Sequence, residues 1–241
     1  MTEFHHAPIS VAALPLWLVC FPEDGEPFVR HLLSLLDGEG LMLYAEEDGV
    51  TVCQGLLLPL TLSGRRGYYL YAVCTHPAYR GRGYMHAFLS AARETAVTEG
   101  KDFLLLIPAT TELSDSYRRH GFTQNVRLAA DERGEHPIYR LPDTVPLSPF
   151  DGDFRALFDR YGGGLSFPVF CAALASLSDS TQIFYTEHGF CVLAKNSERE
   201  CLTADKKTLS LCKICPSPYR ALLCPLSDVS LTTEVADPLP R

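Results

Sequence analysis

The chain has 241 residues, 46% of them hydrophobic, which is enough for one large domain or two smaller ones with cores of their own. Its formal net charge is −8. This charge argues against a general binder of nucleic acids or anionic membranes, because affinity for phosphate backbones rests on accumulated Lys and Arg. A local basic group can still bind one small anion.

Cysteine usage and the N-terminal segment together favour a cytoplasmic protein. The apolar run at 9–21 is too short to span a bilayer and lacks the basic flank and cleavage site of a secretory signal. The nine cysteines are an odd number and stand among apolar neighbours, which is typical of reduced core thiols rather than a disulfide framework. We interpret His5 and His6 as part of a mobile terminus.

The beginning of the chain is predicted to form two helices and then a meander of three strands. Apolar residues at helical spacing indicate the two short amphipathic helices. Their apolar faces are formed by Leu14, Trp17, Leu18 and Phe21, and by Phe28, Leu32, Leu35 and Leu36. Strands are predicted at 41–46 and 50–62, joined across Asp48-Gly49, because Gly accepts the positive φ of a tight hairpin turn. A second turn at 63–67 leads into a strand at 68–75.

Beyond the third strand the hydrophobic period changes to that of a helix. The helical face is formed by Met85, Phe88, Leu89, Ala92 and Ala96. Gly100 stands where a left-handed cap would end this helix. The apolar residues 103–107 predict a buried strand of the kind that pairs in parallel, so that strand, helix and strand form a crossover unit. A short helix at 112–121 and strands at 122–128 and 138–141 are predicted to follow.

The sequence predicts a division of the chain near its middle. Residues 141–153 are rich in Pro, Asp and Ser and have no periodicity, so we interpret them as a linker. We expect a first domain over 1–145 and a smaller α+β module over 146–241. In the second part, helices are predicted at 154–161 and 168–177, and strands near 183–185, 190–194 and 209–212.

Two glycines and two arginines stand at the start of the helix that follows the third strand. Gly81 and Gly83 allow a sharp turn and a close approach of a ligand to the main-chain N–H groups. The first N–H groups of a helix lack partners and, with the macrodipole, favour an anion. Arg80 and Arg82 add charge-assisted donors on either side. The sequence therefore predicts a diphosphate site here. It is neither a dinucleotide fingerprint, which needs Gly at His86, nor a P-loop.

This stretch resembles the GNAT superfamily of acyl-CoA-dependent N-acyltransferases, whose signature is R/Q-x-x-G-x-G/A. Arg80-x-x-Gly83-x-Met85 matches it with Met at the last small position, unless the signature is shifted; such a substitution resembles the branch that includes Eis-type acetyltransferases. The predicted elements and "SYRRHGF" follow the family's order over about 9–141. The resemblance implies an α/β fold, a mixed sheet with a splayed parallel pair, followed by a smaller α+β module that resembles a truncated GNAT half.

The resemblance also implies which residues contact acetyl-CoA, the expected co-substrate. The pantetheine arm would pair with the third predicted strand, and the diphosphate would lie on the turn that follows. The matching positions are Val73, Cys74, Thr75, Arg80, Gly81, Arg82, Gly83, Tyr84 and Met85. Tyr117 matches the family's general acid, which reprotonates the leaving CoA thiolate. Alternatively, Tyr117 packs over the core beside Phe122.

The general base is not defined by the sequence. The candidates near the expected cleft are Tyr69, Tyr71, His76, Glu112 and Asp115, and each also has an ordinary structural explanation. A water relay is an equal alternative. Eis-type enzymes use a terminal carboxylate delivered by a third domain, which is not evident in this sequence, so that role is not transferred to Arg241.

The expected function is transfer of an acetyl group to a primary amine on a small molecule or peptide, with no nucleic-acid or membrane partner. The alternative is a non-catalytic protein that senses acyl-CoA or mediates assembly on the same scaffold. No metal is expected. Cys212-x-x-Cys215, with Cys201 and Cys224 nearby, forms only one close pair without His, so core or edge thiols fit better than zinc.

Overall fold

The computed structural model describes residues 3–62 and 64–128, and shorter pieces of the chain beyond them. These pieces are 137–140, 148–149, 155, 166, 168–169, 171, 183–186, 189–193, 199–204, 213–216, 221–226 and 234–235. The chain divides into two compact units, one with Met1–Asn125 and Ala221–Thr232 and one with Val126–Arg220 and Thr233–Arg241. The boundary predicted between 145 and 146 falls in a segment outside the described residues, so it stays a prediction.

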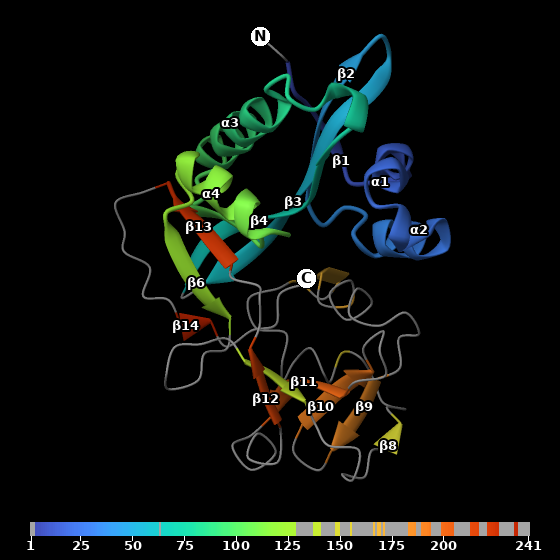
Figure 1. Ribbon diagram of the computed structural model, residues 1–241, viewed down its shortest axis with the longest axis vertical. Coiled ribbons are helices and arrows are strands. Elements are labelled where there is room, and N and C mark those ends of the chain that lie inside the picture. The colour runs from blue at the N-terminus through green and yellow to red at the C-terminus, as the bar shows by residue number, and fades with distance from the viewer. Residues whose placement is uncertain are drawn as a thin grey trace. The chain divides into compact units, whose positions relative to one another are not determined.

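The first unit follows the predicted order of elements. They are β1 (His5–Pro8), α1 (Leu14–Cys20), α2 (Glu26–Leu35), β2 (Leu41–Glu47), β3 (Val50–Leu62), β4 (Arg65–Thr75), α3 (Tyr84–Thr98), β5 (Phe103–Leu106), α4 (Thr111–Arg119), the start of β6 (Gln124–Leu128) and β13 (Ala221–Pro225) (Figure 1). The helices and strands predicted up to α4 are confirmed, although β4 begins at Arg65 rather than Tyr68. Asp48 and Gly49 both have positive φ in the hairpin turn.

The sheet of the first unit has the order β1-β2-β3-β4-β5-β13, and β6 starts beside β13. β1 to β4 are antiparallel neighbours, β4 and β5 run parallel, and β13 is antiparallel to β5. Figure 1 shows α1 and α2 on one side of this sheet and α3 on the other. Phe88 of α3 and Leu57 of β3 are fully buried in the core on the α3 side. The predicted mixed sheet is confirmed.

The interpretation of His5 and His6 as a mobile terminus was wrong. These residues belong to β1, which pairs with β2 and places His6 opposite Leu43. The His6 Nε2 atom lies 3.3 Å from the Thr95 hydroxyl on α3. A four-residue edge strand with mostly exposed side chains has no hydrophobic alternation, so only its pairing with β2 defines it.

β13 reaches the first sheet from far along the chain. It pairs along β5, with Leu223 opposite Leu105, and was not predicted from the sequence. Its Cys224 is buried, which confirms a core thiol at this position. The side chains of Cys201, Cys212 and Cys215 lie outside the described residues.

The second unit contains a sheet of order β12-β7-β11-β10-β9-β8. The strands are β7 (Pro137–Arg140), β8 (Ser148–Pro149), β9 (Ile183–Thr186), β10 (Gly189–Leu193), β11 (Arg199–Ala204) and β12 (Lys213–Pro216), and β14 (Glu234–Val235) pairs with β6. Strands predicted at 183–185 and 190–194 are confirmed, and the strand at 138–141 pairs in this sheet. The helices predicted at 154–161 and 168–177 and the strand at 209–212 fall largely outside the described residues. No described helix is long and apolar enough to cross a membrane.

Candidate functional site

The parallel pair of β4 and β5 is open at one end. Its ladder starts at Gly67 opposite Phe103 and stops at Tyr69 opposite Leu105. β4 continues to Thr75, and beyond Tyr69 it pairs, among the described strands, with β3 alone. Its other edge therefore presents main-chain N–H and C=O groups that can pair with an extended ligand. This is the splayed pair expected from the sequence, and it exposes the edge that carries Val73 to Thr75.

A bulge bends β4 where it leaves β5. The register of β3 and β4 shifts between Gln54 and Leu56, and the facing Ala72 has a φ of +50°. Positive φ is costly for a residue with a Cβ, so the backbone is strained at this point. A bulge re-aims the groups of its strand and is common next to active sites. The N–H groups of β4 beyond the bulge therefore point in a different direction from those of a regularly paired strand.

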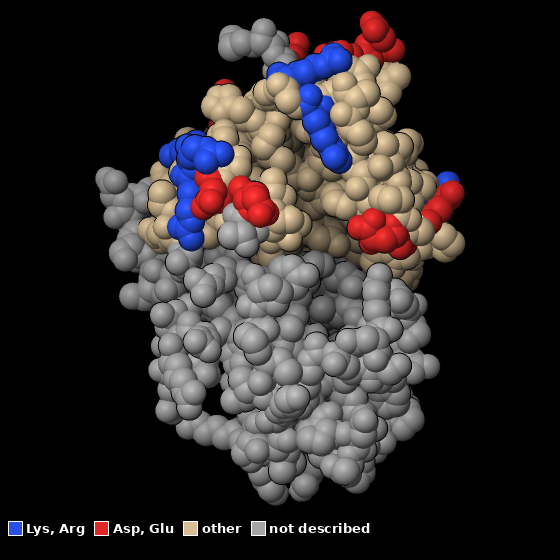
Figure 2. Space-filling model, in the orientation of Figure 1, with Lys and Arg blue, Asp and Glu red and all other residues tan. Residues whose placement is uncertain are grey.

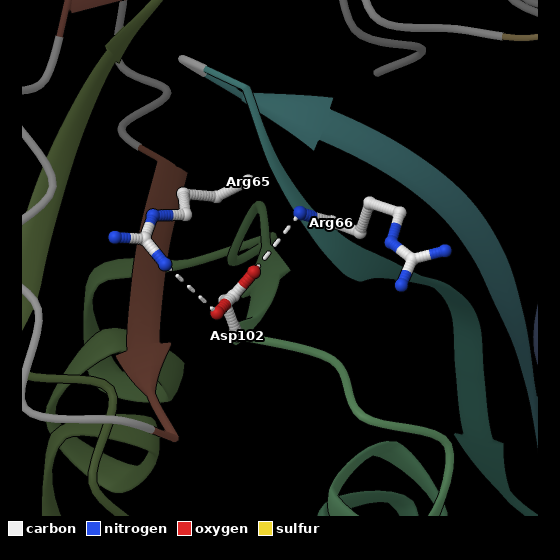
Figure 3. Close-up of polar contacts among 3 residues, drawn as sticks. All are labelled: Arg65, Arg66 and Asp102. Atoms are coloured by element: carbon white, nitrogen blue, oxygen red, sulfur yellow. Dashed lines mark hydrogen bonds and ion pairs between the residues drawn. The ribbon is translucent and has the colours of Figure 1, made fainter.

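The other end of the strand pair is closed by Asp102, which directly precedes β5. Its carboxylate accepts a hydrogen bond from the Arg66 N–H at 3.2 Å and pairs with the Arg65 guanidinium at 3.5 Å (Figure 3). The Asp102 N–H donates to the Arg66 carbonyl at 2.7 Å. These contacts join the first residues of β4 to the start of β5, so that only the far end opens.

The turn between β4 and α3 has the geometry expected for an anion cradle. Gly81 and Gly83 have φ values of +77° and +87°, and an added Cβ at either would meet no atom within 4 Å. Gly83 is the N-cap of α3 and supplies no side-chain cap. The first N–H groups of α3 are consequently available to a ligand, and the open surroundings of both glycines fit a diphosphate.

The side chains of this turn have different roles. Arg80 Nε donates to the Thr75 carbonyl at 3.2 Å, which ties the turn to the end of β4. The Arg82 guanidinium lies 4.8 Å from the centre of the Tyr79 ring. The Tyr84 hydroxyl is hydrogen-bonded to Glu47, and this bond raises the pKa of Tyr84 to about 12. Tyr84 can therefore offer only its main-chain N–H to an anion.

Tyr117 of α4 lies in the core of the first unit and contacts Phe122. The two rings are 5.8 Å apart and meet edge to face at 64°. Burial raises the pKa of Tyr117 to about 12, so its hydroxyl keeps its proton at neutral pH. The packing alternative is therefore present in the structure. The hydroxyl also remains a proton donor, as a general acid must be.

Four of the five candidate bases, all except Asp115, have environments that do not favour that role. Burial raises the pKa of Tyr69 and Tyr71, which keeps both hydroxyls protonated. His76 Nδ1 accepts a hydrogen bond from the Ala78 N–H at 3.2 Å. Glu112 is fully exposed, and hydrogen bonds from its own N–H and from Thr110 lower its pKa.

Residues of α1 that the sequence did not single out approach the open part of β4. The Trp17 ring lies 5.7 Å from the Tyr71 ring, and its Nε1 donates to Asp24 at 2.7 Å. The Cys20 thiol is 3.5 Å from the Thr75 carbonyl. Both residues have the apolar spacing of an ordinary helix, so no local pattern distinguishes them from core residues.

A splayed parallel pair that leads through a glycine turn into an uncapped helix is the arrangement expected from the resemblance to acyl-CoA-dependent acyltransferases. Comparison with known families agrees, because residues 11–124 match the acetyltransferase (GNAT) domain. Residues 11–124 of the chain are thus similar to GNAT acetyltransferase domains. A search of curated proteins finds no match.

Solved structures share the fold at low sequence identity. A conserved protein of unknown function from Enterococcus faecalis V583 is 13% identical, with a TM-score of 0.60 over 94% of this chain and 73% of the other. A GCN5-related N-acetyltransferase from Anabaena variabilis is 13% identical, with a TM-score of 0.55 over 93% and 73%. Eis1 from Mycobacterium abscessus is 15% identical, with a TM-score of 0.50 over 83% of this chain and 54% of Eis1. The resemblance to the branch that includes Eis is thus confirmed for the fold.

Proposed function

We propose that the chain transfers an acetyl group from acetyl-CoA to a primary amine, by direct attack in a ternary complex. The observation that carries this proposal is the open edge of β4, which runs through Arg80 into the uncapped start of α3. A pantetheine arm has amide groups that suit the edge at Val73 to Thr75, where Arg80 and Cys20 already contact the Thr75 carbonyl. A diphosphate suits the N–H groups from Gly81 to Met85.

The chemistry follows from this placement. A neutral amine attacks the thioester carbonyl, and an N–H group of β4 near the bulge at Ala72 stabilises the oxyanion. The carbon–sulfur bond then breaks, and the CoA thiolate takes a proton from Tyr117. Because burial keeps Tyr117 protonated, it serves as an acid and not as the base. A water relay removes the proton of the attacking amine.

The acceptor is an amine on a small molecule or peptide rather than on a nucleic acid. On the face shown in Figure 2, the described basic side chains form separate small groups with acidic groups among them. Together with the net charge of −8, this surface suits one bound anion better than a phosphate backbone.

The test is turnover with a panel of amines. Purified protein with acetyl-CoA should release free CoA, separated by chromatography, only when an acceptor amine is present. Tyr117→Phe should lower kcat about 100-fold, the size expected for loss of an acid catalyst, with little change in KM for acetyl-CoA. Tyr44→Phe makes the same chemical change on β2, which is separated from β4 by β3, and should retain the activity.

Two results would contradict this proposal, and each would point to a different explanation. If acetyl-CoA raises the melting temperature but no amine releases CoA, the chain is an acyl-CoA sensor without catalysis. If turnover occurs and Tyr117→Phe keeps the wild-type kcat, Tyr117 only packs against Phe122 and the acid lies elsewhere.

A further inference from the structure

A thiol and an arginine contact one carbonyl at the end of β4, next to a second cysteine in the strand. Cys20 is the last residue of α1, and its Sγ atom lies 3.5 Å from the carbonyl oxygen of Thr75. Arg80 Nε donates to the same oxygen at 3.2 Å. Cys74 immediately precedes Thr75 in β4. Three separate elements, α1, β4 and the glycine turn, therefore meet at this carbonyl.

The strand register puts Cys74 on the side of the sheet that faces α1. Cys74 is paired with Gln54 of β3, and the Gln54 amide donates at 2.8 Å to the carbonyl of Ala13, just before α1. Residues paired in an antiparallel ladder share a face, whereas neighbours along a strand alternate. Cys53 is paired with Thr75 and belongs to the opposite face, in the core under α3.

Cys20 and Cys74 differ in exposure and in acidity. Cys20 is partly exposed, whereas Cys74 is buried. A hydrogen bond from the Cys74 thiol, helped by the charge of Arg80, lowers the pKa of Cys20 to about 7 against the opposing effect of burial. The same hydrogen bond and burial raise the pKa of Cys74. At pH 7, a pKa of about 7 leaves about half of Cys20 as thiolate, whereas Cys74 stays protonated.

We propose that Cys20 is a site of thiol–disulfide exchange, and that it closes a reversible disulfide with Cys74. The co-reactant is a small disulfide, RSSR. The Cys20 thiolate attacks one sulfur of RSSR, so that a mixed disulfide forms and the first thiolate leaves. Cys74 then loses its proton to water and attacks the Cys20 sulfur, and the second thiolate leaves. In sum, two protein thiols are oxidised and one small disulfide is reduced to two thiols.

The new bond changes the end of β4. A disulfide holds its sulfur atoms about 2.05 Å apart, closer than two free thiols can approach, so its formation should draw the end of α1 and the end of β4 closer to each other. The contact of Cys20 with the Thr75 carbonyl is lost. If the proposed function is right, Val73 to Thr75 line the acyl-CoA arm, and the oxidised protein should bind acetyl-CoA about tenfold more weakly. This coupling rests on the proposed function, whereas the exchange chemistry does not.

The test starts with the full chain and glutathione disulfide at pH 7.5. After an acid quench and proteolysis, mass spectrometry should find a peptide pair joined through Cys20 and Cys74, which dithiothreitol separates. Cys53→Ser, on the other face of the sheet, should retain this link, and Cys20→Ser should abolish it. In the untreated protein, Cys20 should react with iodoacetamide at pH 7 about sixfold faster than an exposed thiol of ordinary pKa, since its larger thiolate fraction outweighs its lower nucleophilicity.

Each arm has a decisive negative result. If glutathione disulfide produces no Cys20–Cys74 peptide, or if Cys20 is alkylated no faster than an ordinary thiol, the exchange site is wrong. If the linked peptide forms but acetyl-CoA affinity is unchanged, the coupling is wrong and the exchange site stands. If no amine is acetylated, the proposed function is wrong, but the linked peptide and the alkylation rate still test the exchange site. The failure of one proposal can therefore be told from the failure of the other.

Discussion

The two ends of the β4–β5 pair show how one strand serves both the fold and a ligand. At the closed end, main-chain and side-chain groups of Arg66 and Asp102 satisfy one another, and the ladder begins at once. At the open end, the same strand leaves β5 after Tyr69, and no described strand pairs with this edge beyond that point. Both ends lie on one continuous strand, so they differ only in whether the main-chain groups of β4 are hydrogen-bonded to β5.

β5 stays in place at the open end because another strand holds it. β13 pairs with β5 from Phe103 to Leu106, beyond the point where β4 departs. The Leu226 N–H, just after β13, donates to the Asp102 carbonyl at 3.0 Å. The closed end and β13 therefore fix β5 together, and the opening needs no flexible strand.

The largest effect is expected where the closed end is most tightly packed. A Cβ at Gly67 would overlap the ring of Phe103, which is fully buried. Gly67→Leu should therefore lower the free energy of unfolding by about 3 kcal/mol, measured by urea denaturation. Combining it with Phe103→Ala makes room and should cost less than the sum of the two single changes. Simple additivity of the two costs would show that the ring is not the obstacle.

A pair of matched glycines separates the two ends by function. Gly83 at the open end and Gly64 before β4 both have positive φ, and neither has crowded surroundings. Valine at either position should cost about 1–2 kcal/mol of stability, because a left-handed backbone disfavours a Cβ. Only Gly83→Val should also weaken acetyl-CoA binding, about tenfold, which corresponds to one lost hydrogen bond to a charged phosphate. If calorimetric titration shows equal affinity of both variants for acetyl-CoA, the diphosphate does not bind at this turn.

Local signals were sufficient for the elements that position the site. The hairpin at Asp48-Gly49, the cap at Gly100 and the turn at Gly81 and Gly83 each depend on a glycine with positive φ, which a sequence displays directly. The same is true of the helical periods of α1 to α3. The splayed pair was expected only from the resemblance to the GNAT superfamily, whose order of elements these features follow, and the diphosphate site at the glycine turn stays a prediction.

Features that depend on distant pairing were not predictable in the same way. β1 is short and exposed, and β13 is separated from β5 by more than one hundred residues, so neither has a local pattern that states its partner. The approach of Cys20 to Thr75 depends on how α1 packs on the sheet. The end of the parallel ladder at Tyr69 likewise depends on the bulge at Ala72. Position 72 has a positive φ but is an Ala, so the sequence has no glycine there that would indicate the bulge.

The smallest effect is expected from the polar contacts of Asp102. Asp102→Asn keeps an acceptor for the Arg66 N–H and loses the ion pair with Arg65, whose side chains are 27% and 43% exposed. Such exposed pairs contribute little, so the loss should be about 0.5 kcal/mol, whereas Asp102→Ala should cost about 1.5 kcal/mol because the N–H also loses its acceptor. Glu26→Gln, which breaks the exposed pair with Arg30 on α2, is the control and should cost about 0.3 kcal/mol.

None of these changes should alter KM for acetyl-CoA, since the open end begins beyond Tyr69. A severalfold rise in KM with Asp102→Asn would mean that the closed end sets the width of the opening. The two ends of the β4–β5 pair would then be coupled rather than independent.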